Sequence, residues 1–251
     1  MQAQPIAPCA LGPAVGDNRR VNHGHDLIDT IEMYLRTIFE LEEEGAVPLR
    51  ARIAERLGQS VPTVSQTVSR MERDGLVTVE GDRRLELTTE GRAVATRVMR
   101  KHRLAECLLV DVIGLEWELV HEEACRWEHV MSETVERRLL EVLGHPSESP
   151  YGNPIPGLAE LGEGGGAVEF RTGLVPLNTV SADTDSVVVR RIGEPIQSDT
   201  ALMSRLRRAG VRPNVPVPIA RQGRQVLIGR DTDATELDDA VAAHVFVTAP
   251  S

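Results

Sequence analysis

The 251-residue chain is 41% apolar and 26% charged, with a formal net charge of −10, so it can bury one large core or two to three small ones. No stretch reaches the roughly 18 to 20 consecutive apolar residues of a membrane span, and the start lacks a basic segment followed by an apolar one. Three cysteines at unrelated spacings, Cys9, Cys107 and Cys125, do not form a disulfide framework. We therefore expect a soluble, cytoplasmic protein of two or three domains.

The acidic surplus is unevenly distributed along the chain. Residues 50–103 contain twelve Lys or Arg and seven Asp or Glu, a local net charge of +5. A basic module inside an acidic protein is typical of nucleic-acid binding, although the excess of arginine over lysine also fits codon bias.

The first predicted helix follows an irregular start. Residues 1–24 are rich in Ala, Pro, Gly and Gln without apolar periodicity, which predicts a disordered extension. From Asp26 onward, apolar residues recur at helical spacing until Gly45, and the stripe consists of Leu27, Ile31, Tyr34, Leu35, Ile38 and Leu41. This pattern predicts one amphipathic helix.

A winged helix-turn-helix is predicted over residues 25–95. Residues 49–57 and 62–74 read as two short helices around a turn at 58–60, and Gly75 ends the second. Residues 76–79 and 85–87 alternate around an arginine-bearing turn at 81–84, which predicts a two-stranded wing.

The helix at 62–74 is the predicted DNA-reading element. Ser60 suits its N-cap and Pro62 its first turn, while Val64, Val68 and Met71 face inward. The candidate contacts to base edges or phosphates are Arg50, Arg52, Ser60, Pro62, Thr63, Ser65, Gln66, Arg70 and Arg83. The alternative is a helical pair whose serines and threonines are merely solvated.

The remaining sequence predicts two more domains. Helical stretches over residues 89–113, from about 116, and ending near 143 indicate a helical domain at 96–145. Prolines and glycines over 146–170 suit a partly ordered linker. Short β-rich runs at 187–189, 215–217, 225–228 and 243–247 predict a small β-barrel over 171–251, with one helix near 200–209.

A cluster of potential metal ligands falls in the helical domain. His102 and Glu106 lie four residues apart, and a second set within an arc of about 100° consists of His121, Cys125, Glu128 and His129. Thiolate, carboxylate and imidazole together suit a first-row transition metal such as Fe, Co, Ni or Zn. The alternative without a metal is that the histidines and glutamates lie on solvated helix faces and that Cys125 is a small buried apolar residue.

Met33 adds to this set, because helical projection places it opposite the apolar stripe of the first helix. The chain also lacks the His-Glu-x-x-His, Gly-x-Ser-x-Gly, phosphate-loop and Cys-x-x-Cys patterns, so a metal-dependent hydrolase is only a remote alternative.

Five segments together carry a family resemblance: residues 29–38, 62–68, 71–76, 121–132 and 152–157. They closely resemble the diphtheria toxin repressor family of iron-dependent regulators, almost without a break from 26 to 162. The resemblance implies a winged-helix domain, a helical dimerisation domain and an SH3-like third domain. It also implies a homodimer, with one or two dimers on each palindromic operator, that represses iron-uptake genes when Fe(II) is bound.

The resemblance further implies roles for single residues. It implies a primary metal site of Met33, Cys125, Glu128 and His129. It implies an ancillary metal site of His102, Glu106 and His121, and an anion site of Arg103, Ser149 and Asn153. Two Fe(II) per subunit follow, with Mn(II), Co(II), Ni(II) or Zn(II) as substitutes.

In the third domain the resemblance is faint. It places Asp199 where the family has a glutamate ligand and Leu202 where it has a glutamine, which predicts a weaker ancillary site. A manganese-responsive or altered-metal paralogue is therefore the alternative, although the sulfur ligands Met33 and Cys125 favour iron.

Overall fold

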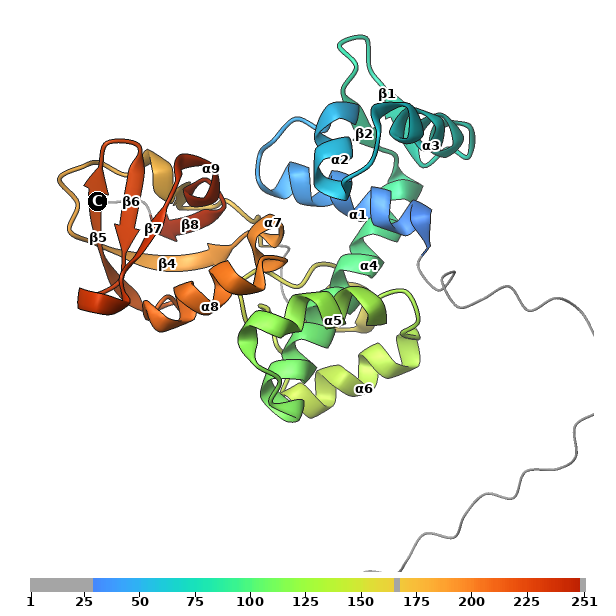
Figure 1. Ribbon diagram of the computed structural model, residues 1–251. Coiled ribbons are helices and arrows are strands. Elements are labelled where there is room, and N and C mark those ends of the chain that lie inside the picture. The colour runs from blue at the N-terminus through green and yellow to red at the C-terminus, as the bar shows by residue number, and fades with distance from the viewer. Residues whose placement is uncertain (1–28, 165–167, 249–251) are drawn as a thin grey trace, which may run out of the picture.

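The computed structural model describes residues 29–164 and 168–248, so the extension expected at 1–24 lies outside the described residues. Figure 1 shows a winged-helix body, a helical body below it and a sheet beside both, with α7 (Glu194–Gln197) between the sheet and α1 (Thr30–Glu43). The predicted fold class, two mainly helical parts followed by an antiparallel sheet, is confirmed.

The winged helix forms where the apolar periodicity predicts it. It consists of α1, α2 (Arg50–Leu57), α3 (Val61–Arg73), β1 (Val77–Val79) and β2 (Leu85–Leu87), and Val77 pairs with Leu87 across the antiparallel wing. The Ser60 side chain accepts the Thr63 N–H at 3.3 Å and so caps α3. Its core is apolar and includes Tyr34, Leu35, Ile38, Ile53, Val64, Val68 and Met71.

The helix α4 (Thr89–Leu108) joins the winged helix to the helical body, since it packs against α1 at one end and against α5 (Val120–Trp127) and α6 (Glu133–Leu143) at the other. The predicted long helix over 89–113 is α4 followed by a π-helical turn, η1 (Leu109–Ile113). A 3-10 turn, η2 (Trp117–Leu119), precedes α5.

The proline-rich stretch after α6 differs from the partly ordered linker expected there. Tyr151 and Asn153 are completely buried, and the Tyr151 hydroxyl donates to the Trp117 carbonyl at 2.7 Å. Arg100 donates to the Gly157 carbonyl at 2.9 Å, just before η3 (Leu158–Leu161). The described part of this segment therefore packs into the fold, because it has its own buried side chains and backbone partners.

The third part is a six-stranded antiparallel sheet with the order β3-β8-β4-β5-β6-β7. Its elements, besides α7, are β3 (Leu174–Pro176), η4 (Leu177–Thr179), β4 (Ser186–Ile192), α8 (Thr200–Arg208), β5 (Pro216–Gln222), β6 (Gln225–Ile228), η5 (Asp231–Asp233), β7 (Thr235–Leu237), α9 (Asp239–Ala242) and β8 (Val245–Thr248). The strands β3 and β7 are missing from the prediction.

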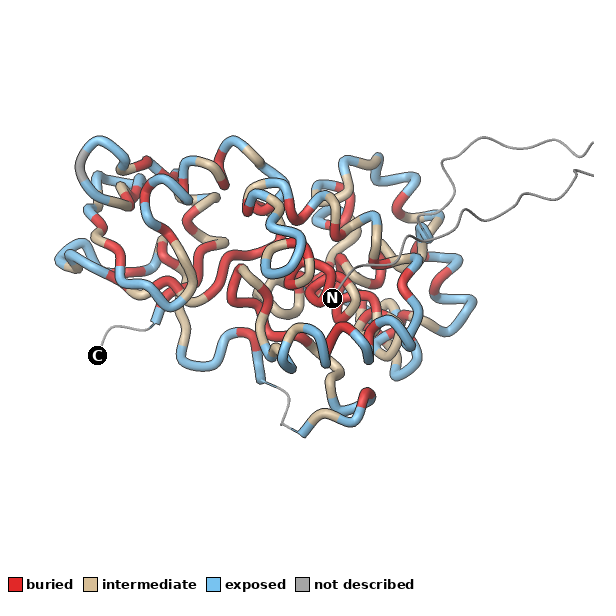
Figure 2. The backbone as a smooth tube through the Cα atoms, turned by 90° about the horizontal axis from the view of Figure 1, so that it is seen from below, coloured by how far each residue is buried: buried red, intermediate tan, exposed pale blue. Residues whose placement is uncertain are grey.

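The sheet and the helical body share one apolar core, because buried side chains from both belong to the same cluster. Figure 2 shows buried segments of the chain through the centre of the molecule. Over residues 29–164 and 168–248, none of the helices combines the length and the apolar character required to cross a bilayer.

The start of α4 provides a test of this packing. Gly91 is buried, and a Cβ built there would lie 1.9 Å from the carbonyl oxygen of Leu76, at the start of the wing. We expect Gly91→Ala to lower the free energy of unfolding by about 1–3 kcal/mol, as overpacked sites do. Gly81→Ala is the matched control, because a Cβ there meets no atom of the described residues within 4 Å. Equal urea midpoints for both variants would contradict the packing.

Candidate metal centre

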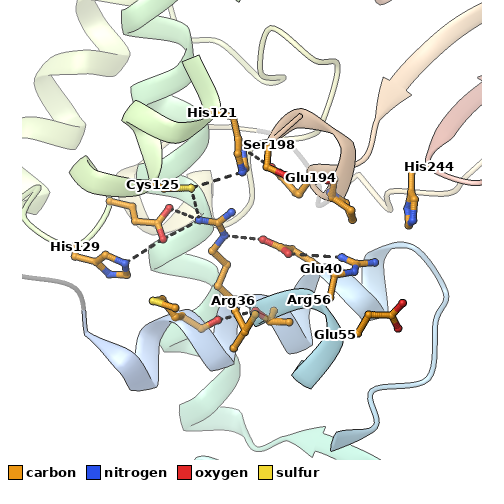
Figure 3. A pocket seen from close by; sticks show the side chains of 15 residues that line it. Arg36, Glu40, Glu55, Arg56, His121, Cys125, His129, Glu194, Ser198 and His244 are labelled. Carbon is orange, nitrogen blue, oxygen red and sulfur yellow. Dashed lines mark hydrogen bonds and ion pairs between the residues drawn. The ribbon is translucent and has the colours of Figure 1, made fainter. Parts of the chain in front are cut away.

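Three parts of the chain meet at one cavity of about 470 Å³. Figure 3 shows its side chains coming from α1, α2, α5 and α7, with Arg36 reaching from α1 toward Cys125. Met33, Cys125, Glu128 and Glu194 all line it, so the predicted ligands of the first helix and of the helical body face a common space.

The ancillary group is compact and fully enclosed. Ligand atoms of His102, Glu106, His121 and Glu194 lie within 4.8 Å of one another. His102 Nε2 is 2.8 Å from Glu106 Oε1 and 3.5 Å from Glu194 Oε2, which is itself 3.4 Å from His121 Nδ1. The structure thus brings the three predicted residues of this site together and adds a fourth from the third part of the chain.

The donor atoms of this group fit a divalent cation. Among the described residues, Glu106 Oε2, His121 Nδ1 and Glu194 Oε2 are buried without a hydrogen-bond partner. Unpartnered buried carboxylate and imidazole atoms are costly unless a cation or a proton satisfies them. Two imidazoles and two carboxylates form a ligand set that first-row transition metals accept.

The ligand expected from the third domain was placed at Asp199, but the acidic residue beside the ancillary group is Glu194, five residues earlier. Asp199 does not join the group, because its Oδ1 accepts the Leu202 N–H at 2.9 Å and caps α8. Leu202 is a core residue, 3% exposed, and does not replace a ligand. The Glu-x-x-Gln pair sought there occurs instead as Glu194 and Gln197 on α7, and the Gln197 Oε1 is buried and unpartnered among the described residues.

The second group centres on Cys125 and Glu128. Arg36 Nη1 donates to Cys125 Sγ at 3.2 Å and to Glu128 Oε1 and Oε2 at 2.9 and 2.7 Å. His102 Nδ1 lies 2.6 Å from Glu128 Oε2 and so links this group to the ancillary one. Sequence reasoning missed Arg36, because a charged residue opposite the apolar stripe resembles an ordinary solvated side chain.

The other two predicted primary ligands lie at the edge of this group. His129 follows Glu128 just past the end of α5, with Nε2 3.3 Å from Glu128 Oε1 and Nδ1 2.6 Å from Glu32 Oε2. Met33 is half-buried and lines the cavity one helical turn before Arg36. Among the His, Cys, Asp and Glu side chains of the described residues, neither His129 nor Glu128 belongs to a compact group of potential ligand atoms.

The electrostatics of the site favour the metal-binding forms of Cys125 and Glu128, whereas neighbouring acidic groups raise the pKa values of His102 and His121 despite their burial, so these imidazoles must release protons before they bind a metal. Burial alone would raise the pKa of the Cys125 thiol, but Arg36 and His121 outweigh it and hold that pKa well below its usual value. Burial likewise opposes ionisation of Glu128, yet Arg36 and His102 lower its pKa to about 2. Thiolate and carboxylate are the forms that coordinate metals.

Two of the three predicted anion residues, Arg103 and Asn153, bind a carboxylate of the chain itself. Arg103 Nη2 donates to Glu194 Oε1 at 3.1 Å and to Glu43 Oε2 at 2.6 Å, and the Asn153 amide donates to Glu194 Oε1 at 3.4 Å. Ser149 is buried, and its Oγ accepts the Tyr151 N–H at 3.2 Å. Glu194 therefore stands where the prediction places an external anion.

The predicted DNA-contacting residues belong to α2, to the start and length of α3, and to the turn of the wing, elements that Figure 1 shows at one end of the molecule. Arg50 and Ser65 are partly buried, Arg52 donates to the Val47 carbonyl at 2.7 Å, and Arg70 lies 3.7 Å from Asp74. The exposed residues of the set are Arg52, Ser60, Pro62, Thr63, Gln66, Arg70 and Arg83. Arg83 adopts a left-handed backbone (φ 69°) at the wing tip.

Comparison with known proteins identifies family matches for the winged-helix part and for the helical body. The family described as "Iron dependent repressor, N-terminal DNA binding domain" matches residues 26–85, and "Iron dependent repressor, metal binding and dimerisation domain" matches 88–157. An "Iron-dependent repressor IdeR" of Mycobacterium leprae is 65% identical over 196 residues, 78% of this chain and 85% of that one. The "Diphtheria toxin repressor" of Corynebacterium diphtheriae is 54% identical over 217 residues, 86% and 96% of the two chains.

Solved structures agree with the fold. "Crystal structure of T. acidophilum IdeR" has a TM-score of 0.68 at 26% identity, covering 92% of this chain and 100% of that one. "Manganese-dependent transcriptional repressor complex with manganese" has a TM-score of 0.72 at 27% identity, covering 88% and 100%. Fold and site define a metal-binding, DNA-binding transcriptional regulator and not an enzyme. The chain belongs to the iron-dependent repressor family.

The depressed pKa of Glu128 predicts a pH dependence. Because its folded pKa is about 2 against an ordinary 4.5, its contribution to stability is present above about pH 4.5 and lost as the pH falls toward 2. In chelator-treated protein, Glu128→Gln should therefore lose less unfolding free energy across this window, by on the order of 2 kcal/mol. The comparison uses urea unfolding at several pH values. Identical slopes for variant and parent would contradict the assigned pKa.

Proposed function

We propose that this protein is an iron(II)-activated transcriptional repressor that binds palindromic operator DNA as a homodimer and controls iron uptake and homeostasis genes in the cytoplasm. The observation that carries the proposal is the cavity in which side chains of α1, next to the DNA-reading unit, face sulfur, carboxylate and imidazole ligands of the helical body. Bound iron would supply a divalent charge that these ligands neutralise together.

The primary site would be formed by Met33, Cys125, Glu128 and His129. The pKa of Glu128 is lowered to about 2, and the Arg36 charge is the largest of the effects that hold the pKa of Cys125 well below its usual value despite burial. Met33 belongs to α1 and the other three residues to the segment at the end of α5, so coordination by all four fixes α1 against the helical body. The free energy of binding then favours one placement of the reading helix α3.

The ancillary site would be formed by His102, Glu106, His121 and Glu194, which gives two iron ions per subunit. Glu194 brings α7 and therefore the third part of the chain into this site. Arg103 and Asn153 orient the Glu194 carboxylate, and together with Ser149 they remain our candidates for contact with an exogenous anion.

DNA recognition would use α3 and the wing. Thr63, Ser65 and Gln66 offer polar groups at the start of a capped helix, the position that helix-turn-helix proteins place against base edges. The phosphate contacts would be made by Arg50, Arg52 and Arg83, while Arg70 would face the groove with the polar residues of α3, and Ser60 and Pro62 lie at the helix start. Exposed apolar residues on the helical body, among them Val112, Ile113 and Val130, suit the interface of a homodimer. One or two such dimers would bind each operator.

Manganese activation is the second candidate, since a structural relative is described as manganese-dependent and in complex with manganese. Carboxylate and water ligands suit manganese, whereas the Cys125 thiolate and the Met33 thioether suit softer metals. This donor set favours iron here, with Co(II), Ni(II) or Zn(II) as substitutes in vitro.

Operator binding with and without Cys125 tests the proposal. We expect Fe(II) to promote an anaerobic gel shift on palindromic DNA, chelation to abolish it, and Cys125→Ser to require at least about tenfold more metal, because one thiolate ligand is lost. Cys107→Ser is the control, since Cys107 is buried in the apolar core near the Glu148 carbonyl. An unchanged metal response in Cys125→Ser, or a stronger response to Mn(II) than to Fe(II), would contradict the proposal.

The two kinds of DNA contact make separable predictions. Gln66→Ala should cost about 1–3 kcal/mol on the cognate operator and relax discrimination at one base pair, because it removes a base-edge contact. Arg83→Ala should weaken binding to all sequences and reduce the salt dependence by about one unit of slope, because it removes a phosphate contact. Titrations at several salt concentrations distinguish these outcomes, and the reverse pattern would exchange the two roles.

A further inference from the structure

Arg36 places its guanidinium among the proposed ligands of the primary metal. Its Nη1 lies 2.7 and 2.9 Å from the two carboxylate oxygens of Glu128, 3.2 Å from Cys125 Sγ and 3.5 Å from His102 Nδ1. Figure 3 shows the guanidinium pointing from α1 into this space. Cys125 and Glu128, two of the four proposed ligands of the primary metal, are therefore also acceptors of one arginine.

This interaction is strong because it is shielded from water. The Arg36 side chain is 11% exposed and that of Glu128 is 1% exposed. Charge-assisted hydrogen bonds in such surroundings are among the strongest polar contacts in proteins. Removing the guanidinium without replacing it would leave the buried Glu128 carboxylate with only the imidazoles of His102 and His129, and Cys125 with only that of His121.

Arg36 and a metal cannot use these atoms at the same time. Transition-metal ligands bind at roughly 2.0–2.3 Å, so an ion on Cys125 and Glu128 would bring its charge into contact distance of the guanidinium. Like charges at that separation repel strongly in a low-dielectric site. One of the two cations must therefore leave the donor atoms before the other can use them.

The structure provides a place to which Arg36 can withdraw. Its Nε donates to Glu40 Oε1 at 2.6 Å, one turn along the same helix, and Glu40 lines the cavity beside Arg56. Glu40 can thus retain the guanidinium while Nη1 moves away from Cys125 and Glu128. Met33 lies on the same helix three residues earlier, so this movement takes place beside a proposed metal ligand.

We propose that Arg36 is a built-in competitor of the primary metal: its guanidinium pairs with Cys125 and Glu128, and the metal must displace it, so that Arg36 sets the metal concentration at which the protein responds. This inference rests on the proposed function of that site. It makes Arg36 a determinant of affinity that coordinates no metal itself.

Anaerobic Co(II) titration of the full chain tests the competition, with the thiolate-to-cobalt charge-transfer band reporting coordination by Cys125. Arg36→Gln should bind Co(II) at least about tenfold more tightly than the parent, because the metal no longer displaces a paired charge. Its chelator-treated form should also unfold at a lower temperature, since Glu128 and Cys125 lose their arginine partner and keep only imidazole contacts. Arg56→Gln is the matched control. It removes the same charge from the same cavity, but Arg56 contacts Glu40 and Glu44 and no proposed ligand, so its affinity should change by less than about twofold.

Arg36→Lys keeps the charge and supports the fold, and it provides a second measurement. An ammonium has three donors on one atom and cannot reproduce the planar guanidinium contacts, so the affinity should rise by about threefold. Parent-like or weaker Co(II) binding in both Arg36 variants, with the band absent in Cys125→Ser, would overturn the competition and leave the metal site intact. A band unaffected by Cys125→Ser would instead reject the site itself.

Discussion

Buried negative charge at the junction of three parts of the chain is the constraint on which the site depends. The carboxylates of Glu40, Glu106, Glu128 and Glu194 are almost inaccessible to water, and the Cys125 thiolate lies beside them. Such groups are stable only when cations or protons satisfy them. Within the described chain Arg36, Arg103, His102 and His121 provide that charge, yet Glu106 and Glu194 each keep one oxygen unpartnered. A divalent metal would satisfy the remaining atoms.

The same constraint joins the domains. Arg36 connects α1 to the end of α5, and Arg103 on α4 connects Glu43 at the end of α1 to Glu194 on α7. Gain or loss of a cation at this junction therefore affects the winged helix, the helical body and the third part of the chain together. The reading helix α3 lies outside the junction but packs in the same apolar core as α1. A shift of α1 at the junction would therefore move the helix that reads DNA.

Much of this arrangement could be predicted from the sequence. Apolar periodicity located α1 and the wing, and ligand spacing on α4 and α5 located His102, Glu106, His121 and Cys125, because helical neighbours are fixed by local geometry. Glu194 was missed because α7 is one short turn after an irregular strand, where no periodicity fixes an offset, so the five-residue error toward Asp199 had no internal check. Arg36 was missed because its acceptors are 89 and 92 residues away in sequence.

If the site binds iron as proposed, sulfur from Cys125 and Met33 of the DNA-binding part share one iron ion. X-ray absorption at the iron edge of the anaerobically loaded protein, compared with Met33→Ala and Cys125→Ser, measures this directly. We expect sulfur scatterers in the iron coordination shell of the parent and fewer in each variant. A shell of nitrogen and oxygen alone, the same in all three proteins, would contradict it.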